Sequence, residues 1–284
     1  MVSRRYFPYV FITPFFLLFA FFFVFPVVYA MISSLYVNHF GVTTFSGLKN
    51  YILVFHDGAF WKSIMRVVYY GIIEVTIMLV LALILALILD SPLIKWKTLF
   101  RLIYFLPYAV PAVIAAIMWG FLYAPNLDSA LNILSIFGGP LIRPLNLSEV
   151  LYAIVNISVW EWTGYNMTIY LASLTSIPQE LYDAAMLDGC NQVQVARYIK
   201  LPLLRPTIIL TIVLSIIGAL QLFNKPYILS SLTAISSTYS PNLSIYTTAF
   251  SYLNINLAAA MSVIMTIITM GASIIFLRLT RKAS

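Results

Sequence analysis

Three ionisable side chains lie inside or at the edges of long apolar segments of this sequence: Glu74, Glu161 and Lys225. Placing a charged side chain in hydrocarbon costs at least about 2.5 kcal/mol on insertion scales, so each needs water, an interface or a partner of opposite charge. Two roles are open for such residues: contact with a solute inside a helix bundle, or a structural role through snorkelling or pairing. Glu74 and Lys225 lie near the outer thirds of their segments, which favours the structural role for these two.

Glu161 differs because aromatic and amide side chains surround it in the run 159–166. Aromatic faces can stack on the C–H faces of a sugar ring, while carboxylate and amide groups hydrogen-bond its hydroxyls. Aromatic residues more commonly form belts at membrane interfaces, but this run lies near the middle of its segment. A second polar group follows further along the chain at helical spacing. The residues predicted to contact a solute are Trp160, Glu161, Tyr165, Asn166, Gln221 and Asn224.

The composition indicates which elements carry these residues. Of the 284 residues, 62% are apolar and 9% are charged, whereas soluble proteins carry about 25% charged residues. A helix that crosses a bilayer core needs about 20 mainly apolar residues. We therefore expect an all-α polytopic membrane protein, one domain over residues 1–284. About six transmembrane helices are predicted within 6–37, 67–89, 102–123, 150–174, 206–232 and 257–277.

The basic residues orient these helices. When the chain changes sides at each predicted helix, eleven of the 16 Lys and Arg residues fall on one side, four on the other, and Lys225 within a span. The side richer in Lys and Arg faces the cytoplasm, so both termini are predicted to be cytoplasmic. The net charge of +7 follows from this topology, and no nucleic-acid binding is expected. One cysteine and two histidines are too few for a disulfide framework or a cysteine-rich metal site.

The longer predicted cytoplasmic loop, 175–205, begins with a helix signal. Ser176 and Gln179 have the spacing of a capping box, in which each side chain bonds the other residue's backbone N–H. Gly189 can adopt the left-handed conformation that ends a helix. The sequence therefore predicts a short helix between these residues.

A second helix signal follows directly. Asn191 and Gln194 repeat the capping pattern, and Pro202 is expected to stop this helix before Pro206 opens the next span. Two short helices joined by one glycine, with small side chains at their turn, suit docking into a groove on a second protein. A linker on the membrane surface fits these features equally well, so the residues alone leave both roles open.

A fixed spacing within this loop favours docking. Its residues are Asp183, Ala184, Ala185, Gly189, Ile199, Leu201 and Pro202. They resemble the EAA loop of permease subunits of binding-protein-dependent ABC importers, whose pattern is Glu-Ala-Ala-x3-Gly-x9-Ile-x-Leu-Pro. Asp183 shortens the usual glutamate by one methylene, and Cys190 stands where alanine is common. Further similarity to the carbohydrate branch, which includes maltose, trehalose and glycerol-phosphate permeases, lies at Ser176-Ile177-Pro178, Leu187-Asp188-Gly189, 106–111, 249–252 and 258–261.

The resemblance implies a non-enzymatic permease of the cell membrane that spans the lipid bilayer several times. The sequence has no Gly-x4-Gly-Lys-Ser/Thr phosphate loop, so ATP and Mg²⁺ are expected on a separate pair of ABC ATPase subunits, and no cofactor on this chain. The implied partners are a second permease in a heterodimer and an extracytoplasmic solute-binding protein that delivers a sugar. The residues implied to couple this chain to the ATPase are Asp183, Ala184, Ala185, Asp188, Gly189, Ile199, Leu201 and Pro202.

Other cargoes remain as alternatives. An anionic solute such as glycerol phosphate is expected to need several cations on its path, and Lys225 is the only candidate. A polyamine is expected to need several acids, and only Glu74 and Glu161 are available. A neutral sugar or oligosaccharide fits best. A secondary transporter or a membrane enzyme lacks support, because the sequence has no paired intramembrane acids, catalytic histidine or inverted-repeat pattern.

Overall fold

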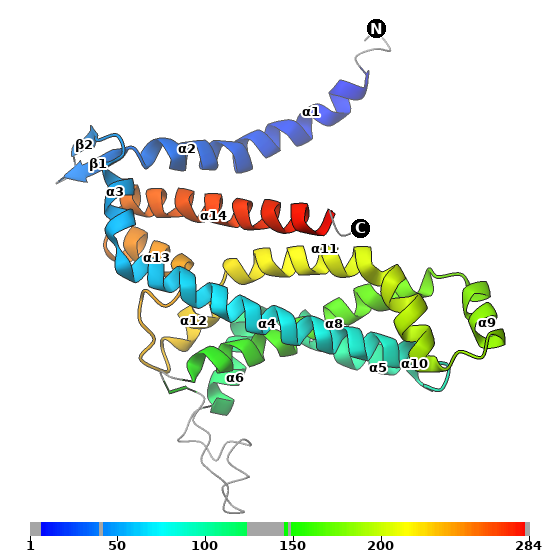
Figure 1. The fold of residues 1–284 in the computed structure, drawn as a ribbon. Coiled ribbons are helices and arrows are strands. Elements are labelled where there is room, and N and C mark those ends of the chain that lie inside the picture. The colour runs from blue at the N-terminus through cyan, green and yellow to red at the C-terminus, as the bar shows by residue number, and fades with distance from the viewer. Residues whose placement is uncertain (1–6, 40–41, 124–144, 147–148, 282–284) are drawn as a thin grey trace, which may run out of the picture.

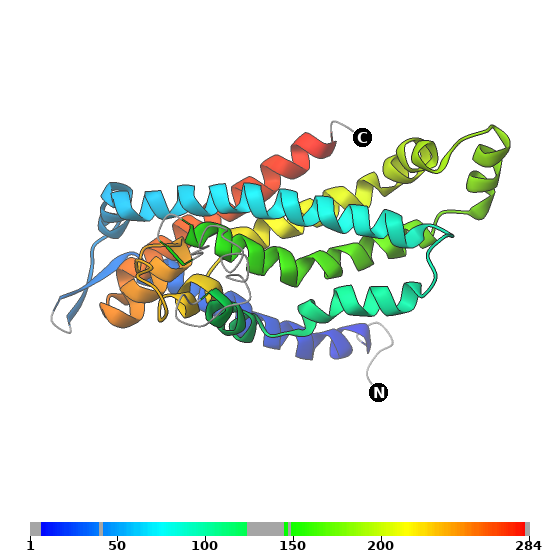
Figure 2. The same ribbon diagram turned by 90° about the horizontal axis from the view of Figure 1, so that it is seen from below.

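A computed structural model describes residues 7–39, 42–123, 145–146 and 149–281. Long helices lie side by side in this part of the chain and form an elongated bundle (Figure 1). A view from below shows one short helix, α9, projecting beyond one end of the bundle (Figure 2). Most of the segment between the predicted spans 102–123 and 150–174, with Arg143, lies outside the described residues, as do Arg4, Arg5 and Lys282.

The N-terminal segment forms one nearly continuous helix that lies along the outside of the bundle. It comprises α1 (Phe7–Phe19), a π-helical turn (Ala20–Val24) and α2 (Phe25–Ser33). None of its most apolar part is buried within this chain, as suits a helix that faces lipid or another membrane protein. The helix of the predicted first span, 6–37, ends at Ser33. At this end the Asn256 amide donates a hydrogen bond to the Ser33 carbonyl at 2.8 Å.

A small hairpin and a short helix follow at the same end of the bundle. The antiparallel strands β1 (Tyr36–His39) and β2 (Val42–Phe45) place Tyr36 opposite Phe45. Helix α3 (Lys49–His56) then turns the chain back towards the bundle. The Asn50 amide fixes this turn, because it donates to the carbonyls of Ser34 and Tyr36 at 2.8 and 2.7 Å.

Two long helices, α4 (Gly58–Asp90) and α8 (Val150–Thr175), form the centre of the core. Asp57 caps α4 by accepting hydrogen bonds from the Ala59 and Phe60 N–H groups. A buried hydrogen bond of 2.7 Å joins Tyr70 of α4 to Ser158 of α8. Such polar contacts help membrane helices associate where hydrophobic burial between them gives little driving force. The predicted segments 67–89 and 150–174 are therefore helical.

The segment predicted as a single span at 102–123 is sharply bent. Helix α5 (Lys97–Phe105) and a 3₁₀ turn (Leu106–Ala109) meet α6 (Ala112–Tyr123) at 94°. The cause lies in two prolines: Pro107 starts the tight turn, and Val110 is extended because Pro111 follows it. The third predicted span is therefore helical but broken, and it counts as one span only if the bent pair crosses the membrane together.

The Thr175–Arg205 region contains the predicted first helix but not its predicted cap. Helix α9 (Gln179–Leu187) has Pro178 at its N-cap, and the Ser176 hydroxyl donates instead to the Ser173 carbonyl at 2.7 Å. Ser176 closes α8 and so cannot also cap α9. The C-terminal prediction is confirmed: Gly189 has φ +80°, and the Gly189 and Cys190 N–H groups bond back into α9 as in a Schellman motif.

The second helix of the loop starts as predicted but does not stop. Asn191 and Gln194 form a complete capping box at α10 (Gln192–Val195). The helix then continues through a π-helical turn (Ala196–Lys200) into α11 (Leu201–Leu220). Pro202 is tolerated because it lies in the first turn after the π-helical segment, where the hydrogen-bond register changes.

The C-terminal part completes the bundle with α12 (Asn224–Leu229), α13 (Pro241–Tyr246), a π-helical turn (Thr247–Ser251) and α14 (Ile255–Arg281). Helix α14 packs between α2 and α11 (Figure 1). Within the described residues, four helical segments are long and apolar enough to cross a membrane, and the bent pair α5–α6 raises this to five. The four are 11–33, 58–90, 192–229 and 255–278.

Candidate solute cavity and coupling segment

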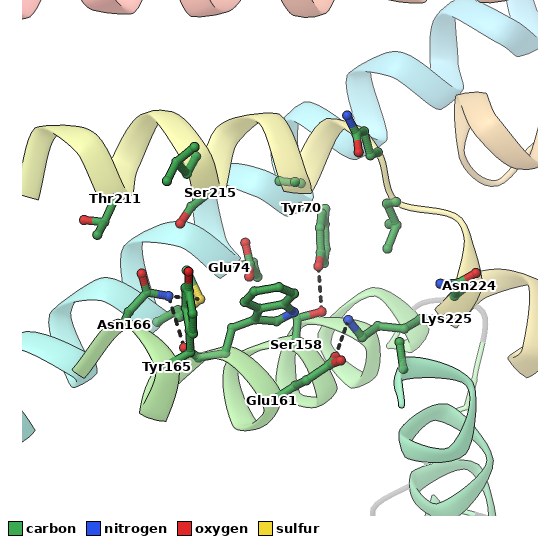
Figure 3. Close-up of a pocket in the computed structure, with 18 of the residues that line it drawn as sticks. Tyr70, Glu74, Ser158, Glu161, Tyr165, Asn166, Thr211, Ser215, Asn224 and Lys225 are labelled. Atoms are coloured by element: carbon green, nitrogen blue, oxygen red, sulfur yellow. Dashed lines mark hydrogen bonds and ion pairs between the residues drawn. The ribbon is translucent and has the colours of Figure 1, made fainter. Parts of the chain in front are cut away.

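A cavity of about 470 Å³ lies between α4, α8 and the α11–α12 junction. Figure 3 shows its polar side chains converging from these elements. Helix α8 contributes residues at positions 158, 161, 162, 165, 166 and 169, which recur every three or four residues and so share one helix face. The principal polar and aromatic groups of the lining are Tyr70, Glu74, Ser158, Glu161, Trp162, Tyr165, Asn166, Thr211, Ser215, Gln221, Asn224 and Lys225.

An ion pair forms part of the wall of this cavity. Lys225 Nζ lies 2.8 Å from Glu161 Oε2, and both residues are buried, at 8% and 4% exposure. The helix break between α11 and α12 makes the contact possible. Gln221 ends α11, and Phe223 adopts a non-helical conformation before α12 begins, so that Lys225 is aimed at α8 (Figure 3).

Glu74 faces the same cavity without a direct partner. Its side chain comes from α4 and is 5% exposed. No other described residue forms an ion pair or hydrogen bond with its carboxylate. The two acids and Lys225 give the cavity a formal charge of −1 when all three are ionised. A buried carboxylate that lacks a protein donor is available to accept hydrogen bonds from hydroxyl groups of a bound molecule.

Amide and aromatic groups line the cavity further along the same face of α8. The Asn166 amide nitrogen donates to the Trp162 carbonyl at 3.0 Å, which fixes the side chain against α8. Trp162 and Tyr165 present aromatic surface, and Tyr108 from the bend after α5 stacks on Tyr165 with ring centroids 4.5 Å apart. Offset aromatic packing of this kind holds the rings in place.

The structure brings together five of the six predicted solute-contacting residues: Glu161, Tyr165, Asn166, Gln221 and Asn224. Trp160 does not line the cavity, because it lies on another face of α8 and packs edge-on against Trp119 at 5.8 Å. Pairing within the bundle is confirmed for Lys225, although the pair also borders the cavity.

Sequence reasoning did not select Tyr70, Ser158 or Trp162 as solute contacts. The three- and four-residue recurrence along α8 could have identified Ser158 and Trp162. The position of Tyr70 depends on how α4 packs, so no local signal marked it.

The predicted coupling residues separate into two groups. Asp183, Ala184, Asp188 and Gly189 are exposed on or beside α9, while Ala185 is 7% exposed and faces inward. Ile199, Leu201 and Pro202 belong to the continuous helix that leads into α11. Helix α9 also exposes apolar side chains that this chain leaves uncovered: Leu181 at 44%, Met186 at 53% and Leu187 at 89%.

Comparisons with known proteins cover nearly the whole chain. The lactose transport permease LacF of Rhizobium radiobacter is 32% identical over 94% of this chain and 91% of its own length. The arabinooligosaccharide permease AraP of Bacillus subtilis is 28% identical over 98% and 90%. The trehalose/maltose permease MalF of Thermococcus litoralis is 32% identical over 84% and 80%.

A solved structure has the same fold. A chain of a bacterial ABC transporter involved in alginate import matches with a TM-score of 0.87 at 20% identity, covering 98% of this chain and 96% of that one. The family model described as "Binding-protein-dependent transport system inner membrane component" matches residues 78–283. This chain therefore belongs to the family of inner membrane components of binding-protein-dependent transport systems.

Proposed function

We propose that this chain is the permease subunit of an ATP-driven importer, and that it carries a sugar or oligosaccharide from an extracytoplasmic binding protein into the cytoplasm by alternating access. Relatives over most of its length are permeases for lactose, arabinooligosaccharides and trehalose/maltose. Others are permeases for sn-glycerol 3-phosphate, so family membership alone does not select the cargo.

The cavity is the observation that carries the choice of a sugar. It combines aromatic surface with carboxylate, amide and hydroxyl groups, the combination that binds a polyol. Lys225 is the one cation among the described lining residues; it is already paired with Glu161, and Glu74 adds a further carboxyl group. A phosphate would find no unpaired cation among the described residues of the lining to offset the loss of its hydration. A neutral hydroxyl-rich cargo is therefore favoured over glycerol phosphate.

Helix α9 is the proposed contact with the ATPase. It projects beyond the bundle (Figure 2) and exposes Leu181, Met186 and Leu187. Apolar side chains exposed together on a projecting helix suit a groove on a partner protein. The proposed coupling segment is 175–205 within a single domain. ATP and Mg²⁺ would bind to the partner ATPase pair, whose closure would bias a bundle with two stable arrangements.

The proposed assembly has two further partners: a second permease that forms a heterodimer with this chain, and a solute-binding protein. The similar alginate transporter has been solved with an alginate pentasaccharide-bound periplasmic protein. The exposed apolar segment α1–α2 offers surface to lipid or to the second permease.

Six spans with both termini in the cytoplasm complete the proposal. Helix α8 would be the additional span, since its 26 residues reach about 39 Å at 1.5 Å per residue. The start of α1, the end of α14 and α9 all lie towards one end of the bundle (Figure 2), which agrees with the Lys and Arg distribution.

Purification of the tagged chain from its source membrane tests this proposal. An ATPase, a second permease and a sugar-loaded binding protein are the expected companions. Isolation of a lone chain that transports solute without ATP would overturn it.

A further inference from the structure

Three elements meet at an ion pair at the C-terminal end of α4. Asp90 is the last residue of α4, and Lys200 is the last residue of the π-helical turn that leads into α11. Lys200 Nζ lies 2.5 Å from Asp90 Oδ2. The side chains of Lys200 and Asp90 are 8% and 17% exposed, so the pair is largely but not completely shielded from water.

Tyr182 of α9 completes the contact. Lys200 Nζ lies 5.3 Å from the centre of the Tyr182 ring, within the range of a cation–π interaction. Burial raises the pKa of Tyr182, and the negative charge of Asp90 raises it further, so the phenol stays neutral beside the pair. The neighbouring Asp183 and Ala184 are exposed, so α9 presents one side to the bundle and the other outward.

This contact links α9 to α4, which are far apart along the chain. Between α9 and α4 the backbone runs through α5, α6 and α8, whereas Tyr182 of α9 contacts Lys200, and Lys200 pairs with Asp90 at the end of α4. Helix α4 has no break over 33 residues and carries Glu74 into the cavity wall. A displacement of α9 can therefore reach the cavity along a rigid helix, provided that the ion pair holds.

We propose that the Asp90–Lys200 ion pair, together with Tyr182, is the joint that transmits movement of α9 to α4, so that these three act as positioning residues for energy coupling. The proposal rests on the proposed function, because it assumes that an ATPase moves α9. The pair is poorly suited to a purely stabilising role. The desolvation of two largely buried charges offsets much of their attraction, so apolar replacement of both is often neutral for stability.

The test uses the complete transporter in proteoliposomes. Asp90→Asn and Lys200→Met each leave one buried charge unpaired and are expected to lower stability as well as coupling. The Asp90→Asn/Lys200→Met double variant is expected to keep the wild-type thermal midpoint. Its sugar uptake per ATP hydrolysed should fall about tenfold, within the usual range of a coupling free energy. The exchanged pair Asp90→Lys/Lys200→Asp should recover coupling, and Arg197→Met, at an exposed residue of the same turn, should leave it unchanged.

A second readout does not depend on the cargo. Spin labels at the exposed residues Glu180 of α9 and Leu93, just after α4, report the separation of the two elements without replacing the apolar side chains proposed to contact the ATPase. In the wild-type complex this separation should keep a narrow distribution with and without ATP, and in the double variant it should broaden. If the distance distribution of the double variant matches that of the wild type, or if a stable double variant couples as well as the wild type, the proposed link between α9 and α4 is wrong. Failure of the wild-type complex to import any sugar would count against the proposed function alone, because the label distances would still test whether the ion pair links α9 to α4.

Discussion

Lys225 Nζ lies 2.8 Å from Glu161 Oε2, although the second half of α8, the helices α9 and α10 and the whole of α11 separate the two residues along the chain. The contact ties the short helix α12 to the centre of α8 and sets the charge of the cavity. Because Glu74 adds a carboxylate nearby, the three groups act as one electrostatic unit.

Lys225→Met is expected to destabilise the chain, because it leaves the buried Glu161 carboxylate without its partner and beside the Glu74 carboxyl group. Breaking one side of a buried pair costs about 3–5 kcal/mol. The matched double variant, Lys225→Met with Glu161→Gln, should regain most of that loss. Thermal unfolding of the purified protein in detergent measures both. If Lys225→Met unfolds at the wild-type temperature, the ion pair does not contribute as the structure indicates.

Asn166→Ala is expected to weaken the apparent affinity for sugar, because its amide lies in the cavity wall. The loss of a hydrogen bond to cargo corresponds to about 1 kcal/mol, or roughly fivefold. Trp160→Ala is the control from the same stretch of α8, since Trp160 packs against Trp119 away from the cavity. It should leave affinity unchanged while lowering stability. Initial rates of uptake over a range of sugar concentrations distinguish the two, and equal affinity losses would contradict this placement of the cavity.

Gly189→Val is expected to impair coupling, because Gly189 has φ +80° and other residues pay about 1–2 kcal/mol in that conformation. Gly189→Asn should be milder, since asparagine enters the left-handed region more readily. No described atom lies within 4 Å of the position that a Cβ would occupy, so conformation and not crowding distinguishes the two. The ratio of sugar uptake to ATP hydrolysis should be highest for the wild type, lower for Gly189→Asn and lower again for Gly189→Val. Gly189→Pro or a bulky residue at Ala185, which is buried, should uncouple transport most severely.

Gly164→Ala is expected to disturb the packing of α5 on α8, because a Cβ at Gly164 would overlap the backbone carbonyl of Tyr104. Backbone overlap cannot be relieved by a side-chain rotation, so the helices must separate. Gly271→Ala in α14 is the matched control, since open space surrounds the position of its Cβ. Yield and thermal midpoint should fall for Gly164→Ala alone. Equal values for the two variants would show that α5 does not approach α8 so closely.

Local signals predicted local structure well. Gly189 and the Asn191–Gln194 capping box depend on hydrogen bonds within a few residues, so the sequence sufficed. Ser176 failed because two neighbouring helices compete for it, and it closes α8. The bend at Pro107 and Pro111 was visible as proline spacing, but a hydropathy window averages over such a break.

The candidate site was only partly predictable. The run 159–166 marked the correct stretch of α8, yet consecutive residues on a helix point about 100° apart, so Trp160 and Glu161 lie on different faces. Spacing along one helix could have separated them. The pairing of Glu161 with Lys225 could not be predicted in the same way, because it depends on the break at Gln221–Phe223 and on the packing of α12.

Uptake of a labelled neutral oligosaccharide by the reconstituted complex is the most direct test of the proposed function. Accumulation should require ATP and the binding protein, and excess glycerol 3-phosphate should not compete with it. Accumulation without ATP would contradict the proposed ATP-driven importer, and effective competition by the phosphate ester would contradict the assignment of a neutral sugar to the Glu74–Glu161–Lys225 cavity.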